Sequence, residues 1–291
     1  MFKGSLVALI TPFRNGALDE TAFQDLAAWQ IKEGTHGLVP CGTTGESPSL
    51  HESEHRRVIA LCAEAAAGKV PVIAGTGSNS TEHTIALTRQ AKEAGADAAL
   101  IVCPYYNKPT QEGLYQHFKA VHDAVDLPIV IYNIPGRSSV DMSNATMARL
   151  AKLPNIIGVK DATNDLTRPL RMRVEIGPDF CLLSGEDATA VAYLVQGGQG
   201  CISVTANAAP RLCAEMHEAW QKGDVATVRR INERLFPLHD ALFVETSPAP
   251  IKYAVSLLGR ATAEVRQPLW AIQPETRERV ERAMRGAGVL N

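Results

Sequence analysis

Ile156-Ile157-Gly158-Val159-Lys160-Asp161-Ala162-Thr163 is a short apolar stretch that runs into a lysine. Its length and its β-branched residues predict a buried parallel strand, so a lysine near its end needs a physical reason. Removal from water lowers the pKa of a lysine, and the neutral amine can then attack a carbonyl carbon to form an imine. The alternative is a lysine that extends to solvent at a barrel rim or pairs with a carboxylate. The strand alone does not distinguish the two interpretations.

The chain on both sides of this stretch alternates short apolar runs with segments of helical spacing. The first helix is predicted to begin after Asp19, to bury Phe23 and Leu26 on one face, and to end at Gly34. The segment between Lys160 and Cys181 is the weakest helix prediction, because Pro169 must lie near its start. The expected strands are residues 6–10, 37–41, 70–74, 98–103, 128–132, 156–160, 181–184 and 201–204.

Eight such alternations predict an α/β fold with a parallel sheet, and eight is the number that closes a (β/α)8 TIM barrel. An open doubly wound sheet is the alternative, but the first strand is not followed by a GxGxxG loop. We therefore expect residues 1–223 to form one barrel.

Residues 224–291 contain no strand-like run and predict a C-terminal helical extension packed on the barrel. Helices are expected within 225–235, 251–258 and 275–284. Their limits are expected at prolines, namely Pro237, Pro248, Pro250, Pro268 and Pro274. A small separate domain is the alternative, although no flexible polar linker precedes the segment.

Composition narrows the class of partner. The 29 Lys and Arg residues nearly balance the 31 Asp and Glu residues, which disfavours nucleic acid and membrane surfaces and favours a small molecule. The N-terminal residues lack the pattern of a signal peptide, and no apolar stretch is long enough to span a bilayer. The six cysteines are scattered along the chain without a CxxC pair, which favours reduced thiols over disulfides. We expect a cytoplasmic protein.

Polar residues follow several of the predicted strands, where a barrel carries its chemistry. The second strand leads into Cys41-Gly42-Thr43-Thr44-Gly45-Glu46-Ser47, whose glycines let backbone N–H groups approach a carboxylate beside two hydroxyls. A glycine-rich turn with capping threonines is the structural alternative. Tyr105, Tyr106 and Tyr132 follow or end two further strands, and packing is the ordinary role of such tyrosines.

His51-Glu52-Ser53-Glu54-His55 matches the HExxH pattern of zinc ligands. Ser49 stands three residues before Glu52 at the start of an apolar helical stretch, which is the spacing of a capping box. We interpret these residues as a helix cap and predict no metal.

Four motifs together resemble the dihydrodipicolinate synthase family of Schiff-base aldolases, which includes N-acetylneuraminate lyase. They are Gly42-Thr43-Thr44-Gly45-Glu46, Tyr105-Tyr106-Asn107-Lys108-Pro109, Tyr132-Asn133-Ile134-Pro135 and Gly158-Val159-Lys160-Asp161-Ala162-Thr163. The likeness runs from Phe2 to the C-terminal helices.

The resemblance implies that Lys160 forms an imine with pyruvate and that Tyr132 donates and accepts protons. It implies that Thr43 and Tyr106 complete a hydroxyl relay, with Tyr106 crossing from a neighbouring subunit. Three further positions match the substrate site: Thr44 and the backbone of Ile202, which hold pyruvate, and Gly185 on the barrel floor.

In this resemblance, the residue at position 137 distinguishes family members that act on different acceptor substrates. Members that cleave sialic acid or keto-deoxy sugars act on hydroxyl-rich acceptors, whereas L-aspartate-4-semialdehyde carries a carboxylate that suits a bidentate guanidinium. Arg137 matches that position, and Thr43 and Tyr106 follow the same pattern. The resemblance therefore implies condensation of pyruvate with the semialdehyde in the diaminopimelate route to lysine, without a metal or organic cofactor. A surface arginine in a polar loop is the structural alternative for Arg137.

Other pyruvate-dependent aldolases of the family and a keto-acid-binding barrel without chemistry are the alternative functions. The resemblance also implies a homotetramer built as two dimers. It further implies a site for L-lysine as feedback inhibitor, at Ser47, His55, Asn79, His83 and Tyr105. Glu52 and His83 depart from the charges of inhibited members, so the resemblance does not fix how strongly L-lysine inhibits.

Overall fold

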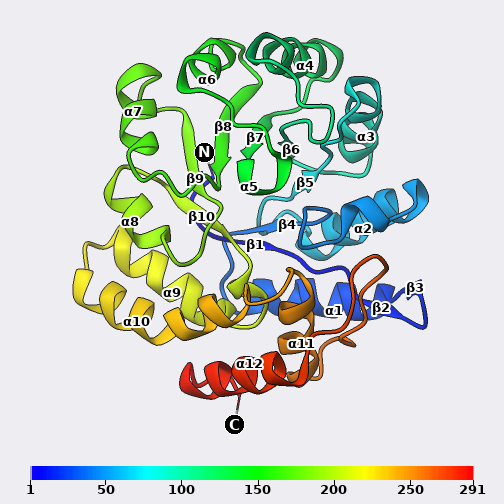
Figure 1. Ribbon diagram of the computed structural model, residues 1–291, viewed down its shortest axis with the longest axis vertical. Helices are drawn as coiled ribbons and strands as arrows, with labels where there is room; N and C mark the ends of the chain where they lie inside the picture. Colours follow the sequence, from blue (N-terminus) through cyan, green and yellow to red (C-terminus); the bar gives the residue numbers. More distant parts are fainter. Residues whose placement is uncertain (1, 291) are drawn as a thin grey trace.

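The computed structural model describes residues 2–290 and contains a sheet of eight strands in the order β4-β1-β10-β9-β8-β7-β6-β5. Neighbouring strands pair in parallel, and a parallel bridge between Leu38 and Val72 joins the two ends of this order. Figure 1 shows helices around the outside of the sheet. The predicted (β/α)8 barrel is confirmed. The strands are β1 (Gly4–Ala8), β4 (Gly37–Val39), β5 (Ile73–Gly75), β6 (Ala98–Val102), β7 (Ile129–Asn133), β8 (Ile156–Asp161), β9 (Cys181–Ser184) and β10 (Gly200–Ser203).

The strands form where the apolar runs predict them, because each is buried on both faces. Leu6, Val130 and Leu183 belong to the cluster inside the barrel, whereas Ile131 and Leu182 pack outward under the helices. Successive residues of a strand point to opposite faces, which is why adjacent positions belong to different clusters. A short hairpin of β2 (Phe13–Arg14) and β3 (Ala17–Leu18) follows β1 and was not predicted.

The helices of the barrel have clear local signals. Asp19 caps the first one and accepts from the backbone N–H of Ala22 at 3.1 Å. Pro169 lies in the first turn of α7, where its missing N–H costs no helical bond. The helices are α1 (Glu20–Lys32), α2 (Glu52–Ala66), α3 (Thr81–Glu93), α4 (Gln111–Ala124), α5 (Pro135–Ser138), α6 (Asn144–Leu150), α7 (Arg168–Glu175), α8 (Ala190–Val195) and α9 (Pro210–Gln221). Two 3-10 turns, η1 (Ser47–Ser49) and η2 (Thr205–Asn207), lie in the loops after β4 and β10.

Three further helices follow the barrel: α10 (Val225–Ala241), α11 (Ala249–Leu257) and α12 (Pro274–Gly286). Figure 1 shows them in yellow to red beside α9 and α1. Ile231 and Leu235 share one hydrophobic cluster with Leu9 of the segment after β1. This cluster joins the helices directly to the barrel core.

Two local predictions were wrong. Pro237 does not end a helix but lies inside α10, where Leu235 and Leu238 are buried on either side of it. Packing of this apolar face outweighs the hydrogen bond that the proline removes. The capping box of α2 uses His51 and Glu54 rather than Ser49 and Glu52, since the Glu54 carboxylate accepts from the His51 backbone N–H at 3.0 Å. Among residues 2–290, no helix combines the length and apolar character of a membrane span.

Candidate active site

Lys160 and Tyr132 are register partners on the adjacent parallel strands β8 and β7. The Lys160 Nζ lies 4.2 Å from the centre of the Tyr132 ring, and the two residues are only 6% and 5% exposed. A cation or an amine over the face of an aromatic ring is attracted by the ring electrons. The lysine at the end of the strand is therefore enclosed in the barrel rather than extended into solvent.

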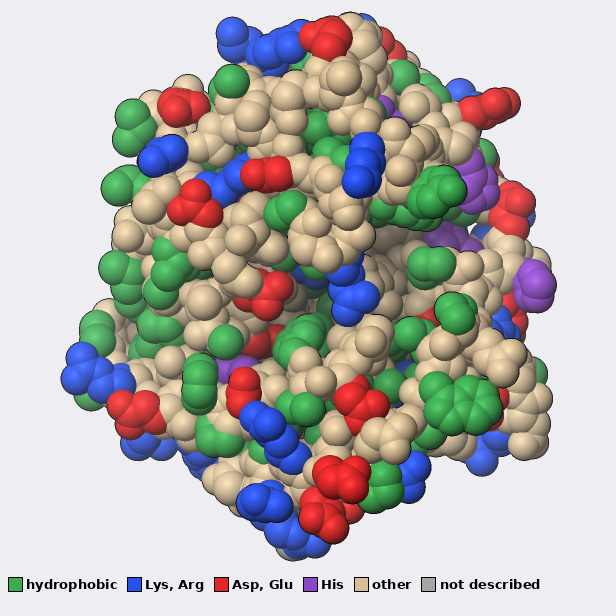
Figure 2. Space-filling view, viewed as in Figure 1, with side chains coloured by type: hydrophobic (Ala, Val, Ile, Leu, Met, Phe, Trp, Pro, Cys, Tyr) green, Lys and Arg blue, Asp and Glu red, His purple; other side chains and the backbone are tan. Residues whose placement is uncertain are grey.

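A cavity of about 260 Å³ lies at this end of the strands. Figure 2 shows that the corresponding face is hollowed near its middle, with Lys or Arg side chains at the edge of the hollow. Five predicted side chains and Gly185 meet in the cavity, together with residues from the loops after β7, β8, β9 and α10. Its lining consists of Thr43, Thr44, Tyr132, Ile134, Gly136, Arg137, Lys160, Ala162, Asn164, Gly185, Glu186, Val204, Phe243 and Ser247.

The loop that carries Thr43 and Thr44 is held by backbone hydrogen bonds. The N–H of Gly45 donates to the carbonyl of Gly42 at 3.1 Å, and the N–H of Glu46 donates to the carbonyl of Thr43 at 3.1 Å. The hydroxyl of Thr11 donates to the Gly45 carbonyl at 2.7 Å. The two threonines therefore sit on a tight turn that the segment after β1 supports through Thr11.

Gly185 allows the closest approach to the lysine. A Cβ atom at this position would lie 2.8 Å from the Cβ of Ala162 and 3.1 Å from the Cε of Lys160. The site thus has no space for a side chain at residue 185. This position lies beside the side chain of Lys160.

Ile202 lies in β10 opposite Leu6 and is completely buried. Val204, two residues further along the chain, lines the cavity, whereas Ile202 does not. The Asp187 carboxylate holds this strand end, because it accepts from the N–H groups of Val204 and Thr205 at 2.8 and 3.1 Å. The end of β10 that carries Ile202 is therefore firmly anchored.

Arg137 belongs to the short helix α5, directly after β7. Its guanidinium donates from Nη2 to the carbonyl of Ser247 at 3.4 Å. Ser247 comes from the loop between α10 and α11, so the extension also contributes to the wall of the cavity. The arginine thus brings a positive charge to the cavity that Thr43 and Thr44 also line.

Glu186 is a site residue that the sequence reasoning missed. Burial raises the pKa of its carboxyl, while the positive charges of Lys160 and Arg137 act in the opposite direction on that pKa. A signal was present, since Gly185 and Glu186 directly follow the predicted strand 181–184. Phe243 and Ser247 had no such signal, because they belong to the helical extension.

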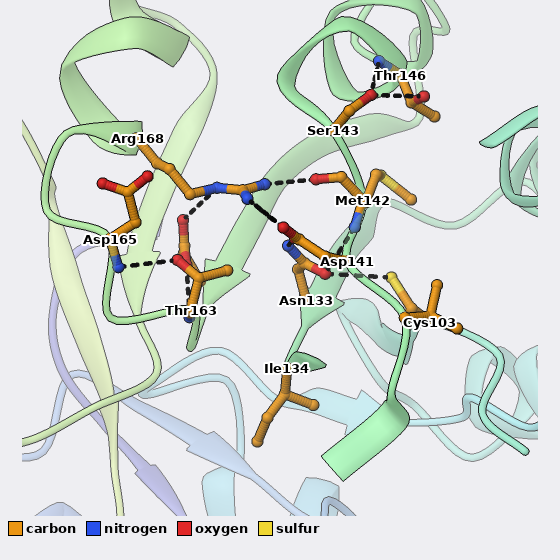
Figure 3. Close-up of polar contacts among 12 residues, drawn as sticks. Cys103, Asn133, Ile134, Asp141, Met142, Ser143, Thr146, Thr163, Asp165 and Arg168 are labelled. Atoms are coloured by element: carbon orange, nitrogen blue, oxygen red, sulfur yellow. Dashed lines mark hydrogen bonds and ion pairs between the residues drawn. The ribbon is translucent and has the colours of Figure 1, made fainter. Parts of the chain in front are cut away.

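A polar network braces the outer side of β7 and β8. Figure 3 shows the guanidinium of Arg168 beside Asp141 and the backbone carbonyl of Met142, with Asn133 close to Asp141. The Asn133 amide donates to Asp141 at 2.8 Å and its oxygen accepts from the Met142 N–H at 3.1 Å. Asn133 follows Tyr132 on the strand, so this network fixes the strand end directly behind the tyrosine.

The two tyrosines after β6 lie apart from the amine. Tyr105 lines a neighbouring cavity that reaches Thr43 and Tyr132. Tyr106 has a φ of 67° and is 89% exposed. A phenol so exposed on its own chain points outward from the barrel, and the cavity with Lys160 is lined by other residues.

The residues predicted to bind L-lysine gather around a further cavity of about 400 Å³. Ser47, His55, His83 and Tyr105 line it, together with Glu52. The His55 ring nitrogen Nε2 lies 2.8 Å from the Gly75 carbonyl, and burial lowers the pKa of this histidine. Asn79 is the exception among the predicted residues, because it does not line this cavity; its backbone carbonyl accepts from the amide of Asn107 at 2.8 Å.

The HExxH residues do not converge as zinc ligands. His51 is exposed at the start of α2, whereas His55 is buried against Gly75. Within residues 2–290 no group of three or more His, Cys, Asp or Glu side chains is placed to hold a metal ion.

The chain is similar to known proteins over almost its whole length. Residues 1–287 match the model of the dihydrodipicolinate synthetase family. A relative from Rhodospirillum centenum, named 4-hydroxy-tetrahydrodipicolinate synthase, is 70% identical over the full length of both chains. The solved dihydrodipicolinate synthase from Acinetobacter baumannii in complex with pyruvate is 43% identical, with a TM-score of 0.97 and complete coverage of both chains. The enzyme from Cyanidioschyzon merolae, solved with lysine bound, is 39% identical over 99% of each chain, with a TM-score of 0.96.

Proposed function

Because this chain belongs to the dihydrodipicolinate synthetase family, we propose that it condenses pyruvate with L-aspartate-4-semialdehyde through an imine on Lys160. Full-length relatives are named 4-hydroxy-tetrahydrodipicolinate synthase, so the chain is an enzyme of the lyase class with an aldolase-type reaction. The observation that carries the proposal is the enclosed amine of Lys160 above the Tyr132 ring, in a cavity shared with two threonines and an arginine.

The first half of the reaction makes a carbon nucleophile. The neutral amine of Lys160 adds to the ketone carbon of pyruvate, and loss of one water leaves an imine. The imine withdraws electrons from the methyl group, which loses a proton and becomes an enamine. Tyr132 is suited to carry that proton, because a phenol both donates and accepts.

The second half forms the new bonds. The enamine carbon attacks the aldehyde carbon of the semialdehyde, and the aldehyde oxygen takes up a proton. The amine of the same substrate then attacks the imine carbon and displaces Lys160, which closes the ring and returns the free lysine. We assign recognition of the semialdehyde carboxylate to Arg137, whose guanidinium lines the cavity.

The remaining roles follow from position. Thr44 and the backbone at Ile202 would hold the carboxylate of pyruvate, and Gly185 would leave space for it beside Lys160. Thr43 lines both the cavity with Lys160 and the cavity with Tyr105, which suits a proton relay. Tyr106 would complete the relay from a second copy of the chain, in a tetramer of two dimers.

Trapping of the imine tests the proposal. Borohydride added together with pyruvate is expected to leave a reduced pyruvyl adduct on Lys160, detected by peptide mass spectrometry. Lys160→Met should abolish the adduct. Lys152→Arg, which changes an exposed lysine, should keep it. A native protein with no mass shift at Lys160 would contradict the mechanism.

We further propose that the cavity with His55 and His83 binds L-lysine as a feedback inhibitor. The lysine-bound structure of the Cyanidioschyzon merolae enzyme supports this assignment. Calorimetry with L-lysine should give a binding isotherm that His83→Ala weakens, and D-lysine serves as the matched control. A flat titration of the native protein would remove the regulatory role and leave the catalytic proposal intact. A cytoplasmic location remains part of the proposal.

A further inference from the structure

The buried carboxylate of Glu46 has no part in the reaction proposed above. Glu46 ends the loop that carries Thr43 and Thr44, adopts a φ of 55° and is 2% exposed. Residues other than glycine rarely adopt this left-handed backbone conformation. Removing the charge from water also costs free energy, unless surrounding groups bind the carboxylate.

Both oxygens of that carboxylate are bound by the segment that follows the barrel. The Nζ of Lys252, on α11, lies 2.5 Å from Oε1, and the backbone N–H of Arg266 donates to Oε2 at 2.9 Å. The side chains of Lys252 and Glu46 are 0% and 1% exposed. The ring of Phe13 lies under the pair, with its centre 4.1 Å from the Lys252 Nζ.

The link from this pair to the threonines is direct. The Glu46 N–H donates to the Thr43 carbonyl at 3.1 Å, so a shift of Glu46 moves the backbone of Thr43. The Glu46 carbonyl is itself held by the hydroxyl of Ser49 at 3.0 Å. The guanidinium of Arg266 extends the anchor, because it donates to the Ser49 carbonyl at 3.0 Å.

A buried ion pair is a poor source of stability, since two charges must be removed from water to make it. Its known use is to select one arrangement of the groups around it. Here the arrangement is the turn of a substrate loop, and the charge that fixes it comes from a helix 206 residues away.

We propose that Glu46 and Lys252 are positioning residues, by which the C-terminal segment holds the Gly42–Gly45 loop in the geometry that captures pyruvate. This inference rests on the proposed function. The helical extension then contributes to the active site, because the loop conformation depends on the Lys252 cation, which α11 supplies.

Three variants test the pair. Lys252→Met leaves the buried Glu46 charge without its cation and is expected to raise the KM for pyruvate about tenfold or more, with slower imine trapping. Lys252→Arg keeps the cation and should restore most of the affinity. Glu46→Gln combined with Lys252→Met removes both charges. The melting temperature of this double variant should be higher than that of Lys252→Met, while its pyruvate KM stays raised.

Tyr253→Phe is the matched control. Tyr253 is the next residue on α11, and its hydroxyl donates to Glu281 on α12 at 2.5 Å, away from the loop. This change should lower stability without altering the pyruvate KM. Native pyruvate KM and trapping rate in Lys252→Met, or in the double variant, would overturn the inference. Failure of the native protein to form any pyruvyl adduct would instead contradict the proposed function.

Discussion

Tyr132 and Lys160 occupy the same level of the barrel on neighbouring strands, and the Lys160 amine rests 4.2 Å from the centre of the Tyr132 ring. The strand register brings a phenol and an amine together. The Asn133 network behind the tyrosine keeps that register.

Tyr132→Phe should separate imine formation from proton transfer. The ring stays under the amine, so borohydride trapping of pyruvate should persist, whereas turnover should fall about 100-fold or more without the hydroxyl. Steady-state assays and mass spectrometry of the trapped adduct check this. Tyr115→Phe is the control, since that ring lies on α4 under Arg149. Unchanged turnover in Tyr132→Phe would exclude the phenol from the reaction.

Arg137→Ala should impair use of the semialdehyde and spare pyruvate. Loss of a charge-assisted contact to a carboxylate is expected to raise the semialdehyde KM about 10- to 100-fold. The semialdehyde KM of Arg137→Lys should lie between those of the native protein and Arg137→Ala, because an ammonium keeps the charge but not the bidentate geometry. Arg171→Ala, a change at an exposed arginine, is the control. Kinetics with each substrate varied in turn check the split, and equal effects on both substrates would contradict the assignment.

Gly185→Ala should block the site without unfolding the barrel. The added Cβ would lie 3.1 Å from the Cε of Lys160, so the lysine must move before it can meet pyruvate. We expect much slower imine trapping and a lower melting temperature in a protein that still folds, because the Cβ would also lie 2.8 Å from the Cβ of Ala162. Gly286→Ala in α12 meets open space and should behave like the native protein. Trapping at the native rate in Gly185→Ala would show that the lysine does not need its observed position.

Acid should destabilise the fold through buried histidines. Burial lowers the pKa of His117 and His217 from 6.5 to about 4. Because burial favours the neutral histidine, the stability that each neutral ring contributes is fully present above pH 6.5. It is lost as the pH falls towards 4. Each group should contribute a slope of about 1.4 kcal/mol per pH unit inside that window.

Urea unfolding at pH values from 7.5 to 4.5 measures this slope. His217→Leu should flatten it, whereas His51→Leu, which changes an exposed histidine, should not. An identical slope in native and His217→Leu proteins would show that His217 does not carry the acid sensitivity.

The fold was predictable because its signals are local. The apolar runs that became β8 and β9 contain buried residues almost throughout, and such runs predict strands wherever they occur. Helix α1 begins after its capping aspartate for the same reason. Pro237 was misread because the packing of Leu235 and Leu238 is a tertiary effect that outweighs a local breaker.

The site was predictable only in part. Lys160, Tyr132, Thr43 and Thr44 follow or end predicted strands, and the barrel rule brings strand ends together. Glu186 had the same signal and was missed. Phe243 and Ser247 reach the cavity from a helical loop, and no rule of strand order predicts that approach.

By itself the sequence determined the alternation of strands and helices, the eight strands that close the barrel, and the lysine near the end of an apolar run. These are short-range properties, set by hydrophobic spacing and caps along the chain. Only the tertiary structure decided that Tyr132 lies under Lys160 and that Lys252 pairs with Glu46. Such relationships depend on register and packing between segments that are distant along the chain, which no local pattern records.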